Sequence, residues 1–306
     1  MKVIRARVLG FCMGVRRAVE IALRVSENKG TSQVFTLGPL IHNKSVLQML
    51  EKRGVICLEE KTLKKAPQGS TVIIRAHGIS PLVERSLKEQ GLNVLDATCP
   101  NVKTSQNKVK AFAEKGYPVF LAGEENHAEI AGLRGYVDGM PYFVVGKPAA
   151  AEAAATELYR KEASARTALV GQTTISPEEY KAISQAILKI FPGTEIVNSI
   201  CYATSERQEA MLELCAQVEA LIIAGDRESA NTRRLLALAL DLGKPAWLVE
   251  SPADLPCEIW NYKTVGLSAG ASTPDSLIDE IEEVLTVNSV TVSLPKNHQE
   301  SLPGLN

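Results

Sequence analysis

The chain has 306 residues, of which 45% are hydrophobic and 23% are charged, and its formal net charge is -1. This composition is ordinary for a globular protein, and the length allows two or three compact units with a buried core. The charge excludes nucleic acid as the main partner, because a phosphate backbone calls for a clear basic excess. Arginines interrupt the N-terminal segment, and no apolar run approaches the ~20 residues of a spanning helix, so we expect a cytoplasmic protein without membrane contacts.

Short apolar strands alternate with longer helices along the chain. The predicted strands are rich in Val and Ile, and they cover 3–8, 33–37, 71–74, 93–96, 118–121, 167–170, 195–197, 221–224, 246–249 and 264–267. The clearest helices cover 15–26, 44–53, 105–115, 177–190, 204–218 and 230–241, and the Ala-rich segment 149–162 is also predicted to be helical. This alternation predicts parallel sheets covered by helices, with functional residues at the carboxyl ends of the strands.

Three widely separated cysteines begin three similar stretches of sequence. They are Cys12, followed by Gly38 and His42, Cys99, followed by Gly123 and His127, and Cys201, followed by Gly225 and Ser229. Each copy then continues through a strand to Ser-Pro or Thr-Pro, at 80–81, 176–177 and 273–274. Any α/β protein repeats strands and helices, but this would not place a cysteine at the same joint each time. The pattern therefore predicts one unit repeated around a common axis, with three thiols facing that axis.

The repeat also predicts the domain organisation. We expect a first α/β lobe over 13–98, a second over 99–199 and a third over 200–287, with residues 1–12 adding an N-terminal strand to the third. Residues 288–306 are expected to form a C-terminal strand and a tail without a catalytic role. The predicted fold class is thus α/β, with three similar lobes in a pseudo-threefold arrangement.

The six cysteines indicate reduced thiols, because no secretory signal accompanies them. No two of them lie within four residues of each other, which excludes the usual zinc ribbon and the tight ferredoxin run. Any shared metal site must therefore be assembled by the fold. Cys57, Cys215 and Cys257 lie outside the repeat, and we expect them to be buried as small hydrophobic residues.

Polar side chains recur at the strand ends of each copy. His42, His127 and Ser229 follow the strand-ending glycines, and His77, Thr173 and Ser272 each lie between a strand end and the next helix. Because the carboxyl ends of parallel strands meet at one edge, we expect these side chains to face the axis together. Helix N-termini at this edge offer backbone N–H groups that suit a phosphate. His298, in the tail, is expected to have no part in the site.

Nine runs of residues resemble a known family. In chain order they are GFCMGVRRAVE, GPLIHN, RAHGIS, DATCP, HAEIAG, GQTTIS, NSICYATSERQ, SANTRRL and AGAST, and they extend over nearly the whole chain. Together they resemble the 4-hydroxy-3-methylbut-2-enyl diphosphate reductases, the LytB-type family, which complete the non-mevalonate isoprenoid pathway. The resemblance implies that Cys12, Cys99 and Cys201 hold a [4Fe-4S] cluster at the centre of a three-lobed fold, with no protein ligand on the fourth iron.

The resemblance also implies a reaction and a set of site residues. The hydroxyl of an allylic alcohol diphosphate would leave as water, with two electrons and two protons consumed, to give isopentenyl and dimethylallyl diphosphates. Glu129 would supply a proton through the Thr173 hydroxyl, with His127 as a further catalytic residue, although local sequence alone would place Glu129 on the surface at a helix start. The residues implied to bind the substrate are His42, His77, His127, Thr173, Ser229, Asn231 and Ser272. The family often has a second Ser between Ser229 and Asn231, where this chain has Ala230.

The electrons are expected to come from a protein. No GxGxxG fingerprint follows a strand, which argues against bound NAD and for a donor of the ferredoxin or flavodoxin type. We expect a monomer or a weak homodimer. Two other functions stay open at this point: a binding module in which three Cys and one His hold structural zinc, and an electron carrier whose [4Fe-4S] cluster meets no substrate. A brown colour would exclude zinc, and the ring of His, Ser and Thr argues against a carrier.

Overall fold

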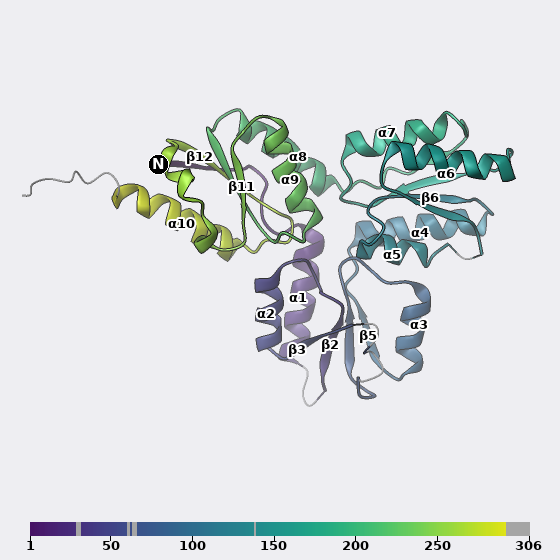
Figure 1. Ribbon diagram of the computed structural model, residues 1–306. Coiled ribbons are helices and arrows are strands. Elements are labelled where there is room, and N and C mark those ends of the chain that lie inside the picture. The colour runs from purple at the N-terminus through teal and green to yellow at the C-terminus, as the bar shows by residue number, and fades with distance from the viewer. Residues whose placement is uncertain (29–31, 60–61, 63–65, 138, 292–306) are drawn as a thin grey trace, which may run out of the picture.

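The computed structural model describes residues 1–28, 32–59, 62, 66–137 and 139–291 of the chain. They form three α/β lobes that meet at the middle of the molecule (Figure 1), and each lobe is built on one four-stranded sheet. All the strand pairs that the structure describes are parallel. The predicted class, α/β with three similar lobes, is therefore confirmed.

The three sheets share one strand order. The first is β3-β2-β4-β5 and the second β7-β6-β8-β9, while the third is β11-β10-β12-β1, so the N-terminal strand takes the place of β5 and β9. The strands are β1 (Lys2–Arg5), β2 (Val34–Leu37), β3 (Val55–Leu58), β4 (Thr71–Ile74), β5 (Asn93–Asp96), β6 (Val119–Ala122), β7 (Tyr142–Val145), β8 (Ala168–Gly171), β9 (Glu195–Ile196), β10 (Ala220–Ala224), β11 (Ala246–Val249) and β12 (Thr264–Ala269). The first strand of the chain thus completes the last sheet.

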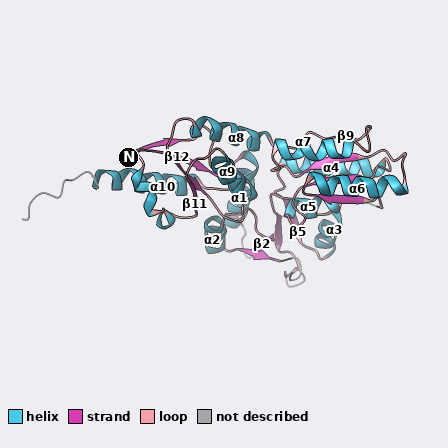
Figure 2. Cartoon of the chain, turned by 45° about the horizontal axis from the view of Figure 1, so that its top comes forward, coloured by secondary structure: helices cyan, strands magenta, loops and turns pink. Residues whose placement is uncertain are grey.

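Helices cover the sheets of all three lobes (Figure 2). They are α1 (Met13–Glu27), α2 (Lys44–Lys52), α3 (Pro81–Glu89), α4 (Pro100–Glu114), α5 (Ala128–Arg134), α6 (Pro148–Lys161), α7 (Pro177–Leu188), α8 (Tyr202–Cys215), α9 (Ala230–Asp241) and α10 (Asp275–Thr291), with short 3-10 turns at Pro252–Asp254 and Cys257–Asn261. Ser80 and Ser176 cap α3 and α7, each followed by a proline, as the sequence predicts. The Ala-rich segment forms α6, as predicted.

The second lobe shows how the sheets are buried on both faces. Phe120 and Ala122 of β6 pack in the cluster that contains α6 and α7, whereas Val119 and Leu121 pack in the cluster that contains α4 and α5. Successive strand residues point to opposite faces, so a strand covered on both sides must be apolar throughout. Each fully buried side chain of this size contributes roughly 1.5–3 kcal/mol.

A glycine ends the first strand of each lobe for a steric reason. Gly38, Gly123 and Gly225 have φ values of +72°, +158° and +145°. A Cβ at each of them would come within 2.7 Å of a side chain in the loop that follows the neighbouring strand. Two loops at the carboxyl edge of each sheet therefore approach closely, and this contact together with the positive φ favours glycine at all three positions.

Two strands and three helix starts differ from the sequence prediction. The sequence prediction lacks β3 and β7, two edge strands whose apolar runs are only four residues long. Helices α1, α4 and α8 begin at Met13, Pro100 and Tyr202, earlier than the predicted starts at 15, 105 and 204. All three helices therefore begin directly after a cysteine of the repeat.

The C-terminal prediction and part of the cysteine prediction are wrong. Residues 288–291 continue helix α10 where a strand is expected, and the rest of the expected tail, with His298, lies outside the described residues. Cys215 is buried as predicted, but Cys57 and Cys257 are exposed. Cys57 lies on edge strand β3, which pairs with another strand on one side only, and it opens into a hollow that residues of α2 also line.

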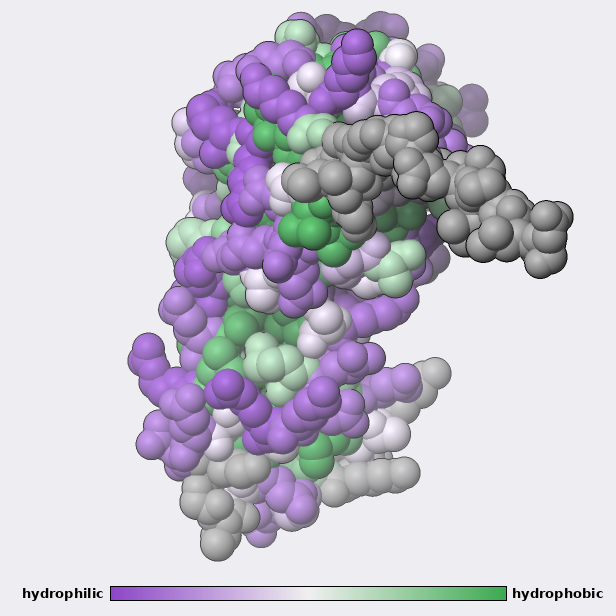
Figure 3. Space-filling model, turned by 90° about the vertical axis from the view of Figure 1, so that its left-hand side faces the viewer, coloured by the Kyte–Doolittle hydropathy of each residue, from purple (hydrophilic) through white to green (hydrophobic). Residues whose placement is uncertain are grey.

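The surface has the character of a globular protein. The face seen in Figure 3 is mainly hydrophilic, with small and separate hydrophobic areas. No helix in the described ranges is both long enough and apolar enough to cross a membrane.

Candidate active site

The three repeat cysteines occupy equivalent positions. Each is the N-cap residue of a helix, Cys12 of α1, Cys99 of α4 and Cys201 of α8. Their backbone N–H groups donate to carbonyl oxygens in the loops after β12, β4 and β8, namely Cys12 to Ala271 at 3.0 Å, Cys99 to Ala76 at 2.9 Å and Cys201 to Thr173 at 2.8 Å. A backbone hydrogen bond of the same kind thus holds each of the three repeat cysteines at the carboxyl edge of a sheet.

Each cysteine also lies where the chain passes from one lobe to the next. Strand β5, before Cys99, belongs to the first sheet, whereas α4, after it, packs in the core of the second lobe. Cys12 and Cys201 stand at the other two joints, between β1 and α1 and between β9 and α8. These three connections between lobes lie at the centre of the molecule, so the three repeat cysteines lie there as well. We propose 13–98, 99–199 and 200–287 as the lobe boundaries.

The N-termini of these helices touch one another. A Cβ on Gly14 would come within 2.4 Å of Cys99 Sγ, so α1 approaches Cys99 closely enough to require glycine. Asn101 Nδ2, from α4, donates to Cys201 Sγ at 3.0 Å. The second residue of one helix therefore reaches the next cysteine of the ring.

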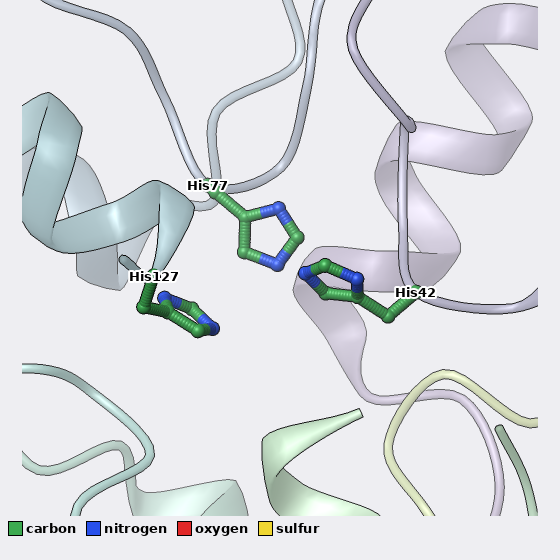
Figure 4. A group of neighbouring side chains, drawn as sticks. All are labelled: His42, His77 and His127. Carbon is green, nitrogen blue, oxygen red and sulfur yellow. The ribbon is translucent and has the colours of Figure 1, made fainter. Parts of the chain in front are cut away.

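Three histidine rings gather beside the cysteines. Figure 4 shows His42, from the loop before α2, His77, from the loop after β4, and His127, the N-cap of α5, pointing toward one another. Their centroids are 4.7 Å apart for His42 and His77, 5.4 Å for His77 and His127, and 5.9 Å for His42 and His127. Within the described chain, the buried His42 Nε2 and His77 Nδ1 have no hydrogen-bond partner. Unpartnered buried polar atoms of this kind point to a polar ligand.

The histidines are neutral in this pocket. Burial lowers the pKa of His42 and, more strongly, that of His77, and it lowers the pKa of His127 to about 4. The neighbouring His42 imidazole and Arg233 act in the same direction on the pKa of His127. An anion placed among the rings would oppose this effect and favour the protonated imidazoles.

The third lobe supplies three buried polar residues to the same place. Ser229 caps α9, with its Oγ accepting from Thr232 N at 3.4 Å. Ser272 Oγ donates to the His42 carbonyl oxygen at 2.8 Å and lies 3.4 Å from Ser229 Oγ. Asn231 is 4% exposed, and its Nδ2 has no partner in the part of the chain that the structure describes. The third lobe therefore closes over the first at the histidines.

Glu129 is buried and paired with Thr173. Its side chain is 1% exposed, so the alternative of a surface residue is wrong. Thr173 N donates to Oε1 at 2.8 Å, and Thr173 Oγ1 donates to Oε2 at 2.9 Å. Burial raises the pKa of Glu129 to about 7, although the two hydrogen bonds from Thr173 oppose the shift. A carboxyl group with this pKa can hold and release a proton near neutral pH.

Arg207 is a buried residue close to the cysteines to which the sequence analysis assigns no role, although it lies within the run NSICYATSERQ. It is 3% exposed, and its guanidinium donates to the carbonyl oxygens of Gly10 at 2.7 Å and Ala203 at 2.8 Å. Among the described residues it forms no ion pair with a carboxylate, and its Nε has no partner. A buried cation without a counter-charge is costly, and negative charge at Cys12 and Cys201 would offset that cost.

One cavity brings all the predicted site residues together. It has a volume of about 100 Å³. Its walls include Cys12, Cys99, Cys201, His42, His77, His127, Glu129, Thr173, Ser229, Asn231 and Ser272. Ala230 also lines it, and it contributes a methyl group between Ser229 and Asn231. The apolar side chains of Val15, Ile41 and Val102 complete the walls.

The cysteines fit a cluster better than a single metal ion. In the described part of the chain, the histidine triad is the one group of three possible ligands whose atoms all lie within 4.8 Å of one another. The three repeat cysteines do not form such a group, whereas the ligands of one tetrahedral zinc, at Zn–S distances of about 2.3 Å, lie under about 4 Å apart. Three thiols that do not gather around one ion leave room for a larger metal group, such as an iron-sulfur cluster.

Comparisons with known proteins agree with the geometry. The family model described as LytB protein matches residues 3–286. The chain is 44% identical over 292 residues to the 4-hydroxy-3-methylbut-2-enyl diphosphate reductase of Treponema denticola, covering 93% of this chain and 99% of that protein. It is also similar to the solved E-1-hydroxy-2-methyl-but-2-enyl-4-diphosphate reductase from Plasmodium falciparum, with a TM-score of 0.87, 28% identity and coverage of 100% and 95% of the two chains. A solved (E)-4-hydroxy-3-methyl-but-2-enyl diphosphate reductase, the terminal enzyme of the non-mevalonate pathway, has a TM-score of 0.70, 36% identity and coverage of 94% and 99%.

Proposed function

This chain belongs to the LytB protein family, and we propose that it is a 4-hydroxy-3-methylbut-2-enyl diphosphate reductase, the enzyme that ends the non-mevalonate isoprenoid pathway. The reaction breaks the allylic C–O bond of the substrate. Two electrons and two protons enter, the hydroxyl leaves as water, and the carbon skeleton becomes isopentenyl or dimethylallyl diphosphate.

One observation carries the proposal: three thiols on equivalent helix N-caps share a cavity with buried polar groups that have no partner among the described residues. The family uses an iron-sulfur cluster. We assign Cys12, Cys99 and Cys201 as its ligands and [4Fe-4S] as its type. When bound, the cluster would pass electrons to the substrate, and its iron without a protein ligand would serve as a Lewis acid for the departing oxygen. Buried Arg207 offsets the negative charge of the thiolates.

The diphosphate occupies the space between the histidines and the third lobe. His42 Nε2, His77 Nδ1 and Asn231 Nδ2 are buried nitrogen atoms in need of acceptors, and phosphate oxygens provide them. His127 and the hydroxyls of Ser229 and Ser272 lie on the same wall. The anion also compensates for the positive charge that protonated imidazoles would bring into a buried site.

Glu129 and Thr173 deliver a proton to the leaving oxygen. Glu129 is the reservoir, because its pKa of about 7 keeps a large share of the carboxyl protonated at neutral pH. Thr173 Oγ1 contacts Glu129 at 2.9 Å and also lines the cavity, so it can pass a proton to the substrate and receive one from the carboxyl group. His127 accepts a hydrogen bond from Glu129 N at 3.2 Å and fixes the start of α5. A ferredoxin or flavodoxin type protein supplies the electrons.

The two alternative functions have less support. A structural zinc site with three Cys and one His would need one histidine among the thiols, whereas the three histidines group with each other. A simple electron carrier would have no use for the buried ring of His, Ser and Asn side chains. The spacing of the sulfur atoms and the polar ring thus favour the reductase over both.

Anaerobic analysis of the purified protein tests the proposal. We expect iron and sulfide in equal amounts, about four of each per chain, with one iron distinct from the others in a Mössbauer spectrum. The same preparation should convert the allylic alcohol diphosphate when a chemical reductant is added. A colourless zinc protein, or an intact cluster without turnover, would overturn the proposal.

A further inference from the structure

The three helices that begin at the cysteines leave their first residues exposed. Met13 of α1 is 59% exposed and Tyr202 of α8 is 73% exposed, although both are large and apolar, and Pro100 of α4 is exposed too. The contacts of Gly14 with Cys99 and of Asn101 with Cys201 hold the three helix tips side by side. Met13, Pro100 and Tyr202 are therefore the exposed first residues of three adjoining helices, and together they are called the tip patch.

The tip patch lies directly over the proposed cluster ligands. Each of its residues follows a cysteine, and the cysteines themselves are only partly buried. In contrast, the residues assigned to proton transfer and to the third-lobe wall are almost fully buried, with Glu129 at 1%, Ser229 at 5% and Ser272 at 6% exposure. Electron transfer slows steeply with distance, so the tip patch offers a short route from the surface to the cysteine sulfurs.

A polar groove of about 340 Å³ continues the tip patch beside Cys99. Its walls include Pro100 of the patch, together with Arg17, Lys103 and one carboxylate, that of Asp96. Lys103 pairs with Asp96 at 3.0 Å, whereas Arg17 donates to the carbonyl oxygens of Thr98 at 3.1 Å and Asp96 at 3.2 Å. Because these carbonyl groups are neutral, they do not cancel the positive charge of Arg17, which can therefore attract an acidic partner.

We propose that the tip patch and this groove are the docking site of an electron-carrier protein that has an acidic rim around an exposed cofactor edge. The inference rests on the proposed function, because the proposed reductase takes its electrons from such a carrier. Large exposed apolar side chains commonly mark interaction sites. Redox encounters are small and transient, so a few such residues with a charged border are enough, and the charges act mainly on the rate of encounter.

Placing a carboxylate in the patch tests the proposal. Tyr202→Asp should weaken binding of an oxidised flavodoxin to the cluster-loaded protein about tenfold, measured by calorimetry at low ionic strength, because it removes a central aromatic contact and repels an acidic rim. Tyr142→Asp is the matched control. Tyr142 is the same residue type, it is 44% exposed, and it begins strand β7, at the sheet edge opposite the cysteines.

Turnover with two reductants separates docking from damage to the cluster. For Tyr202→Asp, the KM for flavodoxin should rise about tenfold, while turnover with reduced methyl viologen and the iron content should match the parent. Met13→Asp should behave in the same way. The proposal would be overturned if both patch variants bound flavodoxin, and also an acidic ferredoxin, as tightly as the parent does. It would also be overturned if turnover fell equally with flavodoxin and with reduced methyl viologen. If the parent converts no substrate with viologen, it is the proposed function that fails.

Discussion

Replacing Glu129 with Gln should make the protein more stable but less active, because burying the acid destabilises the fold while its proton is needed for the reaction. The pKa of Glu129 rises from 4.5 to about 7 on folding. Below pH 4.5 the carboxyl is protonated in both the folded and the unfolded state, so it does not destabilise the fold. Above about pH 7 it is ionised in both states, and the folded state then bears the full free-energy cost of burying the charge. One pKa unit corresponds to about 1.4 kcal/mol, which makes this cost about 3 kcal/mol.

Gln cannot ionise, so the variant avoids that cost. It loses one of the two hydrogen bonds from Thr173, which offsets about 1 kcal/mol of the gain. The free energy of unfolding of Glu129→Gln should therefore exceed that of the parent by about 2 kcal/mol near pH ~8. The advantage should disappear near pH ~5, where the parent carboxyl is mostly protonated. Urea unfolding of both cluster-free chains across this pH range measures the difference.

The same substitution should abolish proton delivery. A positioned general acid contributes about 10²–10⁴ to the rate, so turnover of Glu129→Gln should fall by at least about 10² with the cluster retained. In the parent, kcat/KM should decline as pH rises through about 7, because the carboxyl loses its proton, and the variant should lack this decline. Glu89→Gln, on the exposed end of α3, is the control. A stability difference that does not change with pH, or turnover within tenfold of the parent, would refute the reasoning.

Three further predictions concern the metal, the anion and the lobes. Serine in place of any one of the three helix-capping cysteines should remove the iron, while serine at the exposed Cys57 or Cys257 should leave the iron content per chain unchanged; retained iron in Cys99→Ser would contradict the ligand assignment. The protein should take up protons when inorganic diphosphate binds at pH ~7, because the anion favours the charged forms of histidines that burial keeps neutral. Equal binding heats in buffers of different ionisation enthalpy would argue against this proton uptake. Small-angle scattering of the anaerobic protein should show a smaller radius of gyration with a diphosphate ligand, and an unchanged radius would mean a preformed pocket.

The repeat makes the architecture predictable from sequence. A single short strand is a weak signal, but the same cysteine, glycine and proline positions in three copies strengthen one another. The strand-ending Gly38, Gly123 and Gly225 are the clearest case, since each meets the same steric demand at the same joint. Parallel strands bring the residues after their carboxyl ends to one edge, and this rule alone predicts where the polar ring lies.

Tertiary burial decides the features that local sequence patterns do not predict. Glu129 begins a short helix like many surface acids, and only the surrounding fold, with the Thr173 loop that donates two hydrogen bonds to it, makes it 1% exposed. Cysteine is not among the usual N-cap residues, so the pattern does not predict the early helix starts, although Cys12 Sγ accepts from Val15 N at 3.5 Å. Arg207 does carry a sequence signal, because with Met211 and Leu214 it follows the helical spacing of buried residues on α8.

The position of the cysteines constrains how the lobes can move. Since each cysteine is the joint between a strand of one lobe and a helix of the next, any lobe rotation must pivot at the cluster ligands. The close contact of Gly14 with Cys99 has no room for sliding, so it should persist in an open state. The contacts farther from the pivots, from Ser272 to the His42 carbonyl at 2.8 Å and from Arg233 to Glu124 at 3.2 Å, are the ones that opening would break. Closure by this route would assemble the proposed diphosphate wall while leaving the thiols in place, so that substrate exchange need not disturb the proposed metal site.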